Sequence, residues 1–202
     1  LNRPTAGTIK VFGTDVLNAT EAEQEDISRR WGVLFQQGAL FSSMTVQENV
    51  ETPMREMAHI SADLRPELAR LKVAMSGLPA DACAKYPSEL SGGMQKRAGL
   101  ARALALDPDI VFLDEPTAGL DPIGATEFDE LIKQLKESLG LTVFMVTHDL
   151  DSLHAICDRV AVLAEKKVLV TGTMADMLKV DQPWVKEYFH GPRARAALST
   201  SE

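Results

Sequence analysis

The chain has 202 residues, of which 45% are hydrophobic and 25% charged, and its formal net charge is −8 at pH 7. This length suits one sizeable α/β domain with room for a subdomain. The acidic balance disfavours a general nucleic-acid binder, which usually carries a basic face. Because no apolar run approaches the roughly 20 residues needed to cross a bilayer, we expect no membrane-spanning helix.

Neither the cysteines nor the first residues point to secretion. Cys83 and Cys157 are far apart and lack metal-ligand spacing, so we expect two free thiols, as is usual inside the cell. The opening Leu-Asn-Arg-Pro-Thr carries no apolar segment, and we therefore expect no signal peptide.

The first fifth of the chain predicts a short strand, a helix and a longer strand. Residues 4–13 read as a turn and a strand, and the charged residues 21–30 suit a solvated helix. Residues 32–35 form an apolar run that places Gln36 at its carboxyl end, with Gln37 as the alternative if the register differs by one. A neutral amide there can donate and accept hydrogen bonds at once.

The next segment, residues 45–84, has a helical pattern. Thr45 followed by Glu48 predicts a capping box at a helix start. The residues at helical spacing, which we expect to pack in the core, are Leu64, Leu68, Leu71 and Met75.

Residues 90–106 predict an anion-binding helix start. Ser91, Gly92 and Gly93 stand where free N–H groups and the positive end of the helix dipole would face a phosphate. Residues 94–106 are rich in good helix formers, and Asp107-Pro108 ends the run.

Residues 110–113 are continuously apolar, which is typical of a strand buried on both faces of a parallel sheet. Asp114 and Glu115 follow at its carboxyl end, where open α/β sheets bind ligands. One carboxylate can hold Mg²⁺ while the other polarises an attacking water.

A helix over residues 126–139 and a buried strand over 142–146 predict a right-handed βαβ crossover and a parallel sheet. His148 follows this strand, and its imidazole can donate to a phosphate oxygen. A metal site with His154 is disfavoured, because residues at i and i+6 do not share a helix face. A Ser-His-Asp hydrolase is disfavoured too, since the chain has no G-x-S-x-G sequence.

The last part predicts a hairpin from residues 159–163 and 168–171, and a short helix at 174–179. Residues 183–189 predict an amphipathic turn that groups Trp184, Val185 and Phe189. We expect the small, polar ending, residues 191–202, to be mobile.

Four of these features resemble, in order and spacing, the motifs of ABC-transporter ATPases. LSGGM at residues 90–94 resembles the signature motif, and residues 110–121 resemble the Walker B strand and D-loop. Gln36 resembles the Q-loop glutamine and His148 the H-loop histidine. The resemblance implies a P-loop NTPase-like parallel α/β core with a β-subdomain and an inserted α-helical subdomain. The implied parts are residues 1–39 (core and β-subdomain), 40–105 (α-helical subdomain), 106–172 (catalytic core) and 173–202 (C-terminal helix and tail).

The family works as a head-to-tail dimer that holds ATP between its copies, and this implies a role for each motif residue. Asp114 would bind Mg²⁺ with help from Gln36, Glu115 would be the general base, and His148 would contact the γ-phosphate. Asp121 would link the two sites. The residues that would face the ATP of the second copy are Ser91, Gly92, Gly93 and Met94. Met94 replaces the usual glutamine, and its thioether cannot make the hydrogen bonds of an amide to ribose.

Residues 34–50 and 86–123 most resemble the Mla-type (toluene-tolerance, Mkl-like) ATPases that energise phospholipid movement. The implied partners are an MlaE-like permease, an MCE-domain lipid-binding protein and a small STAS-domain subunit. The implied place is the cytoplasmic face of the inner membrane, and no nucleic acid is implied. The alternatives are the ATPase of another importer, for amino acids or methionine, and a soluble ABC ATPase that acts on DNA or ribosomes. A pure interaction module is a further alternative.

One family motif is missing from the sequence. None of the 13 glycines is followed by Lys, so there is no Walker A loop, G-x-x-x-x-G-K-[ST]. Residues 1–7 resemble the segment directly after the Walker A helix in these ATPases, and we expect the loop and the adenine-stacking aromatic residue to lie upstream. Without those phosphate contacts, we expect this 202-residue polypeptide alone to hydrolyse ATP negligibly.

Overall fold

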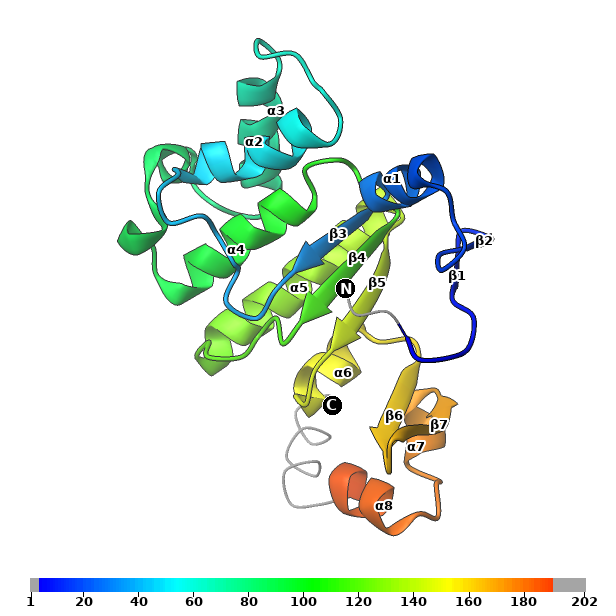
Figure 1. Cartoon of the computed structure of the whole chain (residues 1–202). Helices are drawn as coiled ribbons and strands as arrows, with labels where there is room; N and C mark the ends of the chain where they lie inside the picture. Colours follow the sequence, from blue (N-terminus) through cyan, green and yellow to red (C-terminus); the bar gives the residue numbers. More distant parts are fainter. Residues whose placement is uncertain (1–3, 191–202) are drawn as a thin grey trace.

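A three-stranded parallel sheet forms the centre of the computed structural model, which describes residues 4–190 (Figure 1). Its strands are β3 (Trp31–Leu34), β4 (Ile110–Asp114) and β5 (Thr142–Val146), in the order β3-β4-β5. Leu34 pairs with Leu113, and Asp114 pairs with Val146, so the three carboxyl ends meet at one edge. This confirms the predicted parallel sheet.

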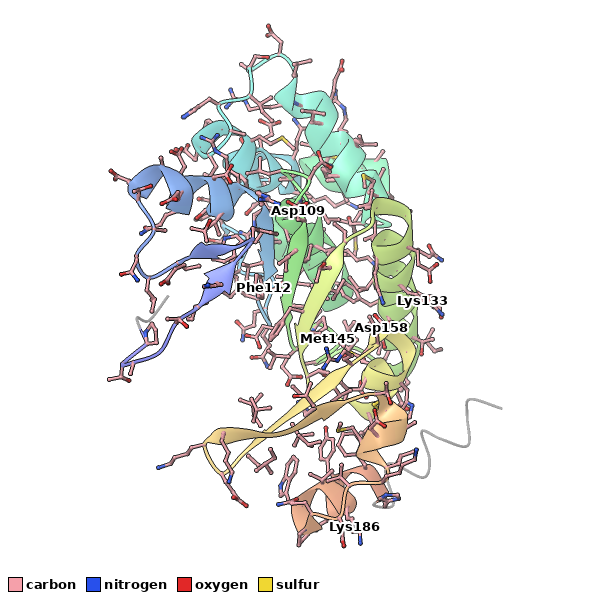
Figure 2. The ribbon with its side chains drawn as sticks, turned by 90° about the vertical axis from the view of Figure 1, so that its right-hand side faces the viewer. Asp109, Phe112, Lys133, Met145, Asp158 and Lys186 are labelled. Carbon is pink, nitrogen blue, oxygen red and sulfur yellow. The ribbon has the colours of Figure 1, made fainter. Side chains whose placement is uncertain are left out.

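Two helices cover one face of the sheet. Helix α4 (Gly92–Ala103) and helix α5 (Pro122–Leu139) pack there on alternate strand residues. The buried residues that they share with the sheet include Leu34, Leu100, Leu104, Val111, Leu113, Phe128 and Ile132. In Figure 2, Met145 lies on the side of α5, while the exposed Lys133 points away from the sheet. The predicted helix over residues 126–139 is confirmed as α5, but it begins four residues earlier, at Pro122.

The opposite face of the sheet carries a row of aromatic rings. The rings of Trp31 and Phe112 are 5.7 Å apart, and those of Phe112 and Phe144 are 5.6 Å apart. Phe144 is 58% exposed and Val146 53% exposed. Our prediction that strands 110–113 and 142–146 are buried on both faces is therefore wrong in this structure, because α4 and α5 both lie on the other side.

The α-helical part joins α4 to two further helices and two 3₁₀ turns. These elements are α2 (Val46–Glu56), α3 (Arg65–Met75), η1 (Ala80–Ala84) and η2 (Pro87–Glu89). They enclose a second core that includes Val46, Val50, Met54, Ala69 and Val73. The predicted capping box is confirmed, since the Thr45 and Glu48 side chains each accept a hydrogen bond from the other residue's backbone N–H.

The prediction that the apolar stripe over residues 64–75 packs in the core is partly wrong. Leu64 is 54% exposed and Leu71 53% exposed, whereas Leu68 and Met75 are partly buried. Helix α3 turns its Ala69 face toward α2 and α4 instead, because small residues allow close helix packing there.

The two ends of the described chain form smaller units. At the start, β1 (Lys10–Val11) and β2 (Thr14–Asp15) form an antiparallel pair, followed by α1 (Glu21–Arg29). After β5 come α6 (Leu150–Ile156), the antiparallel hairpin of β6 (Val160–Ala164) and β7 (Lys167–Gly172), α7 (Met174–Met177) and α8 (Pro183–His190). These confirm the predicted strand, charged helix and hairpin. The predicted mobility of residues 191–202 lies outside the described residues.

Helix α8 differs from the predicted turn in one side chain. Val185 and Phe189 are buried as expected, but Trp184 is 45% exposed and stacks on Tyr188 at 5.2 Å. Across residues 4–190, no helix has the length and apolar character needed to cross a membrane.

The contact between α4 and β3 leaves no room for side chains at two glycines. A Cβ on Gly32 would lie 2.1 Å from the carbonyl oxygen of Ala103, and one on Gly99 would lie 3.0 Å from the Cα of Gly38. The helix backbone therefore rests directly on the strand and on the loop after it.

We predict that Gly32→Ala lowers the free energy of unfolding by about 1–3 kcal/mol, because the methyl group must push α4 away from β3. Chemical denaturation of the chain measures this change. Gly92→Ala is the matched control, since a Cβ at Gly92 meets no atom within 4 Å. Equal stability of the two variants would contradict the close contact.

Candidate functional site

The carboxyl edge of the sheet is where β4 ends and the chain turns sharply. The Glu115 N–H donates to the carbonyl of Val146 at 2.8 Å, which extends the β4–β5 ladder by one residue. Glu115 then adopts a left-handed conformation with φ of 46°. A non-glycine residue reaches this region at a cost, and such strain clusters at functional sites.

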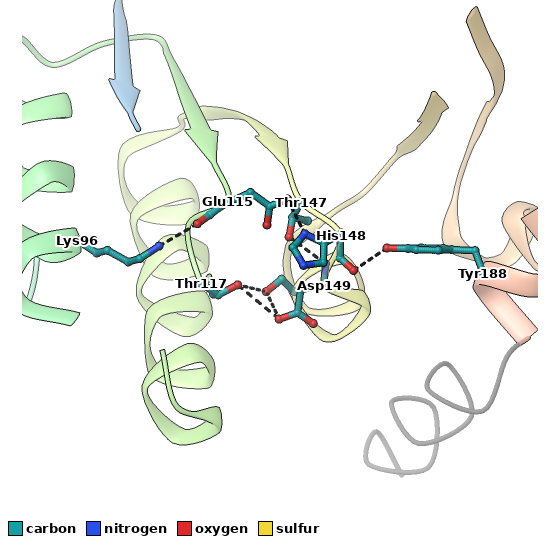
Figure 3. A network of polar contacts seen from close by, with 8 residues as sticks. Lys96, Glu115, Thr117, Thr147, His148, Asp149 and Tyr188 are labelled. Carbon is teal, nitrogen blue, oxygen red and sulfur yellow. Dashed lines mark hydrogen bonds and ion pairs between the residues drawn. The ribbon is translucent and has the colours of Figure 1, made fainter. Parts of the chain in front are cut away.

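Glu115 and His148 meet at this edge. The His148 Nδ1 lies 2.7 Å from Glu115 Oε1, although the two residues are 33 positions apart (Figure 3). The Glu115 side chain is 19% exposed and that of His148 is 79% exposed. A largely buried carboxylate therefore lies beside a solvent-exposed imidazole. Such a pair can take a proton from a water molecule and donate to an anion. The structure thus brings together two of the residues that the sequence singled out.

Asp114 and Gln36 lie at the same edge of the sheet, each at the end of its own strand. Asp114 is exposed at the last position of β4. Gln36 comes after β3 and is exposed, as is Gln37. The loop behind Gln36 is fixed to α4, because Arg102 donates to the carbonyls of Ala39 at 2.7 Å and Gly38 at 2.9 Å.

Helix α4 begins where the sequence predicted a helix start. Ser91 is the N-cap, and its hydroxyl accepts a hydrogen bond from the Met94 N–H at 3.3 Å. Gly92 faces open space, and a Cβ on Gly93 would lie 3.6 Å from Leu120. The signature segment therefore adjoins the loop that precedes Asp121. Met94 itself is partly buried against the core of the α-helical part.

Asp121 caps a helix. Its carboxylate accepts hydrogen bonds from the N–H groups of Ile123 at 3.1 Å and Gly124 at 3.0 Å. Capping of this kind stabilises a helix start, and it explains why α5 begins at Pro122. The link between two copies that the family resemblance implies for Asp121 remains a prediction.

Sequence reasoning missed two residues that hold the backbone of Glu115 and His148 in place. The buried Lys96 Nζ donates to the carbonyl of Glu115 at 2.9 Å, and the Tyr188 hydroxyl donates to the carbonyl of His148 at 2.6 Å (Figure 3). Burial lowers the pKa of Lys96, while the charges of Glu115 and Asp114 act in the opposite direction. No pattern in the sequence marks either residue, because both contacts are made to backbone atoms of distant segments.

A second polar network lies next to the His148 loop and contacts it through Asp149. The buried Ser152 hydroxyl donates to Asp129 Oδ2 at 2.8 Å and lies 3.3 Å from the hydroxyl of Thr117. Thr117 also lies at hydrogen-bond distance from Asp149, next to His148. The other oxygen of Asp129 is buried without a partner. Burial raises the pKa of Asp129 from its usual 3.8 to about 6, with further raising by Asp149, Asp151 and Glu130, against the hydrogen bond from Ser152.

The chain's own side chains offer only part of a metal site. Within residues 4–190, no three His, Cys, Asp or Glu side chains cluster closely enough to hold an ion. Mg²⁺ is commonly bound by one or two carboxylates, with waters and substrate phosphates completing its shell. Asp114 beside Glu115 fits that mode of binding.

Comparison with known proteins agrees with the motifs. The family model described as "ABC transporter" matches residues 1–118, and the model of an AAA domain matches residues 85–153. The chain belongs to the ABC transporter family. Its fold is that of the solved cassettes: the dimeric MJ0796 cassette bound to ADP and Pi superposes with a TM-score of 0.75 at 31% identity, over 85% of this chain and 75% of that one.

Curated relatives carry several transport names. "Probable ribonucleotide transport ATP-binding protein mkl" of Mycobacterium tuberculosis is 38% identical over 96% of this chain and 54% of its own length. "Intermembrane phospholipid transport system ATP-binding protein MlaF" of Haemophilus influenzae is 39% identical over 93% of this chain and 71% of its own length. "Methionine import ATP-binding protein MetN" of Bifidobacterium longum is 38% identical over 94% of this chain and 47% of its own length. The chain thus spans about half the length of the mkl relatives that it matches.

We predict a pH effect from the buried Asp129. Because its pKa is raised, the folded protein keeps this proton to a higher pH than the unfolded chain, and stability falls as pH rises from about 4 to about 6. In Asp129→Asn this loss disappears, so the variant gains stability relative to wild type over that interval. Denaturation midpoints at both pH values measure the gain.

The exposed Glu137→Gln on α5 serves as the control for that measurement, because Glu137 is not among the charges that act on Asp129. If wild type and Asp129→Asn depend on pH alike between those values, the carboxyl of Asp129 is not held protonated by burial.

Proposed function

We propose that the chain is the core of an ATP-hydrolysing subunit that drives an ABC transporter. The observation that carries the proposal is the 2.7 Å contact between Glu115 and His148 at the carboxyl edge of the parallel sheet. A carboxylate and an imidazole that converge where open α/β sheets bind ligands suit attack by water on a phosphate. Membership of the ABC transporter family supports the same reaction.

In this proposal each residue at the edge has one task. Glu115 accepts a proton as the water oxygen bonds to the γ-phosphorus and the bond to the ADP oxygen breaks. His148, held by Glu115, donates to a γ-phosphate oxygen. Gln36 orients the water and contacts the cation. Asp114 holds Mg²⁺, which when bound neutralises charge on the phosphate oxygens.

A second copy of the chain completes the site. Ser91, Gly92 and Gly93 at the start of α4 would bind the phosphates of the partner's ATP through free N–H groups, with Met94 beside them. Asp121 would link the two sites. The dimeric MJ0796 neighbours support this arrangement.

We also propose that the chain divides into four parts: residues 1–39, 40–105, 106–172 and 173–202.

We propose phospholipid as the cargo, moved through an MlaE-like permease with an MCE-domain protein and a STAS-domain subunit at the cytoplasmic face of the inner membrane. The match to MlaF supports this choice, with 39% identity over 93% of this chain and 71% of that relative. Methionine import is the second candidate, on the match to MetN. Transport by the complex reconstituted with its permease in vesicles separates the two: ATP-dependent movement of labelled phospholipid supports the first candidate, and ATP-dependent uptake of labelled methionine supports the second.

We predict that Glu115→Gln in the full-length protein lowers steady-state ATP hydrolysis about 100-fold or more, because the amide cannot accept the proton. Phosphate release under saturating ATP and Mg²⁺ measures this loss, and ATP binding should persist. The exposed Glu137→Gln on α5 is the matched control. Hydrolysis by Glu115→Gln at the wild-type rate would refute the role of Glu115.

A further inference from the structure

Lys96 is a buried cation in the helix that begins with the signature segment. The residue is 6% exposed, and its Nζ donates to the carbonyl oxygen of Glu115 at 2.9 Å. Lysine is almost never buried to this degree unless its charge is paired or hydrogen-bonded. The charges that face it are the carboxylates of Glu115 and Asp114, at the end of β4.

The carbonyl that Lys96 contacts belongs to a strained residue of the candidate site. Glu115 has a φ of 46°, and its carbonyl also accepts a hydrogen bond from the Ala118 N–H at 3.2 Å. Two donors on one carbonyl hold the peptide plane after Glu115 in this orientation. The same residue directs its carboxylate to His148. Lys96 therefore contacts the backbone of Glu115, while the carboxylate of Glu115 faces His148.

Lys96, the donor in this hydrogen bond, lies one helical turn after the signature segment at the start of α4. Ser91 caps α4, Gly92 begins it, and Lys96 projects from the next turn. An α-helix transmits a shift at its first turn to the following turn as a nearly rigid body, because its backbone hydrogen bonds run along the axis. A displacement at Ser91 is thus carried to the carbonyl of Glu115 through a single side chain.

We propose that Lys96 is a positioning residue that couples the start of α4 to the backbone of Glu115. This rests on the proposed function, in which Ser91 binds the partner's ATP and Glu115 serves its own. Nucleotide binding at one site would thereby set the geometry of the proton acceptor at the other. Lys96 itself contacts neither the substrate nor the reacting water.

The test compares Lys96→Met and Lys96→Arg in the full-length protein. Methionine keeps most of the length of the buried stem but removes the donor, so kcat should fall about 10- to 100-fold, as for a catalytic group displaced by about 1 Å. KM for ATP with Mg²⁺ should stay within about 2-fold, because the binding contacts remain. Arginine retains a donor and should restore most of kcat. The exposed Lys133→Met on α5 is the matched control.

Three outcomes would overturn the proposal. Unchanged kcat in Lys96→Met, a rise in KM at constant kcat, or no recovery with arginine each contradict a positioning role. Thermal unfolding of each variant identifies a loss of activity that comes from misfolding. In that case Lys96→Leu, which also lacks a donor, replaces the Met variant with the same expected loss. Glu115→Gln in parallel keeps the two proposals apart, since its full activity would refute the proposed function instead.

Discussion

The site depends on the direct contact between the backbone of α4 and that of β3. Gly32 and Gly99 leave no Cβ between helix and strand, and Arg102 binds the carbonyls of the loop after β3. These contacts lie in the carboxyl half of α4, so they hold that half of the helix to the sheet and to the loop after Gln36. The signature segment, residues 90–94, stands at the other end of the helix, outside these contacts.

The carboxyl edge of the sheet supplies the second constraint. Parallel strands end together, and the turns after β4 and β5 bring Glu115 and His148 within hydrogen-bond distance. Each of these residues is also held through its backbone carbonyl, Glu115 by Lys96 and His148 by Tyr188. The site is therefore supported from α4 on one side and from α8 on the other, as Figure 3 shows.

The sequence predicted the parts of the structure that depend on local rules. Apolar runs and caps located the strands, the helix start at Ser91 and the box at Thr45. Exposure was harder to predict, because it depends on which elements cover a surface: Phe144 and Leu71 are apolar at the right spacing, yet both are more than half exposed. Lys96 was missed because its hydrogen bond goes to a backbone atom 19 residues away, which no side-chain pattern encodes.

The proposed mechanism requires two copies of the protein that enclose nucleotide, with Ser91 and His148 acting on it from opposite sides. The most direct measurement is a structure of the full-length Glu115→Gln protein with ATP and Mg²⁺. We expect each γ-phosphate within hydrogen-bond distance of His148 of one copy and Ser91 of the other. Nucleotide contacted by both residues of the same copy, or by neither, would contradict this mechanism.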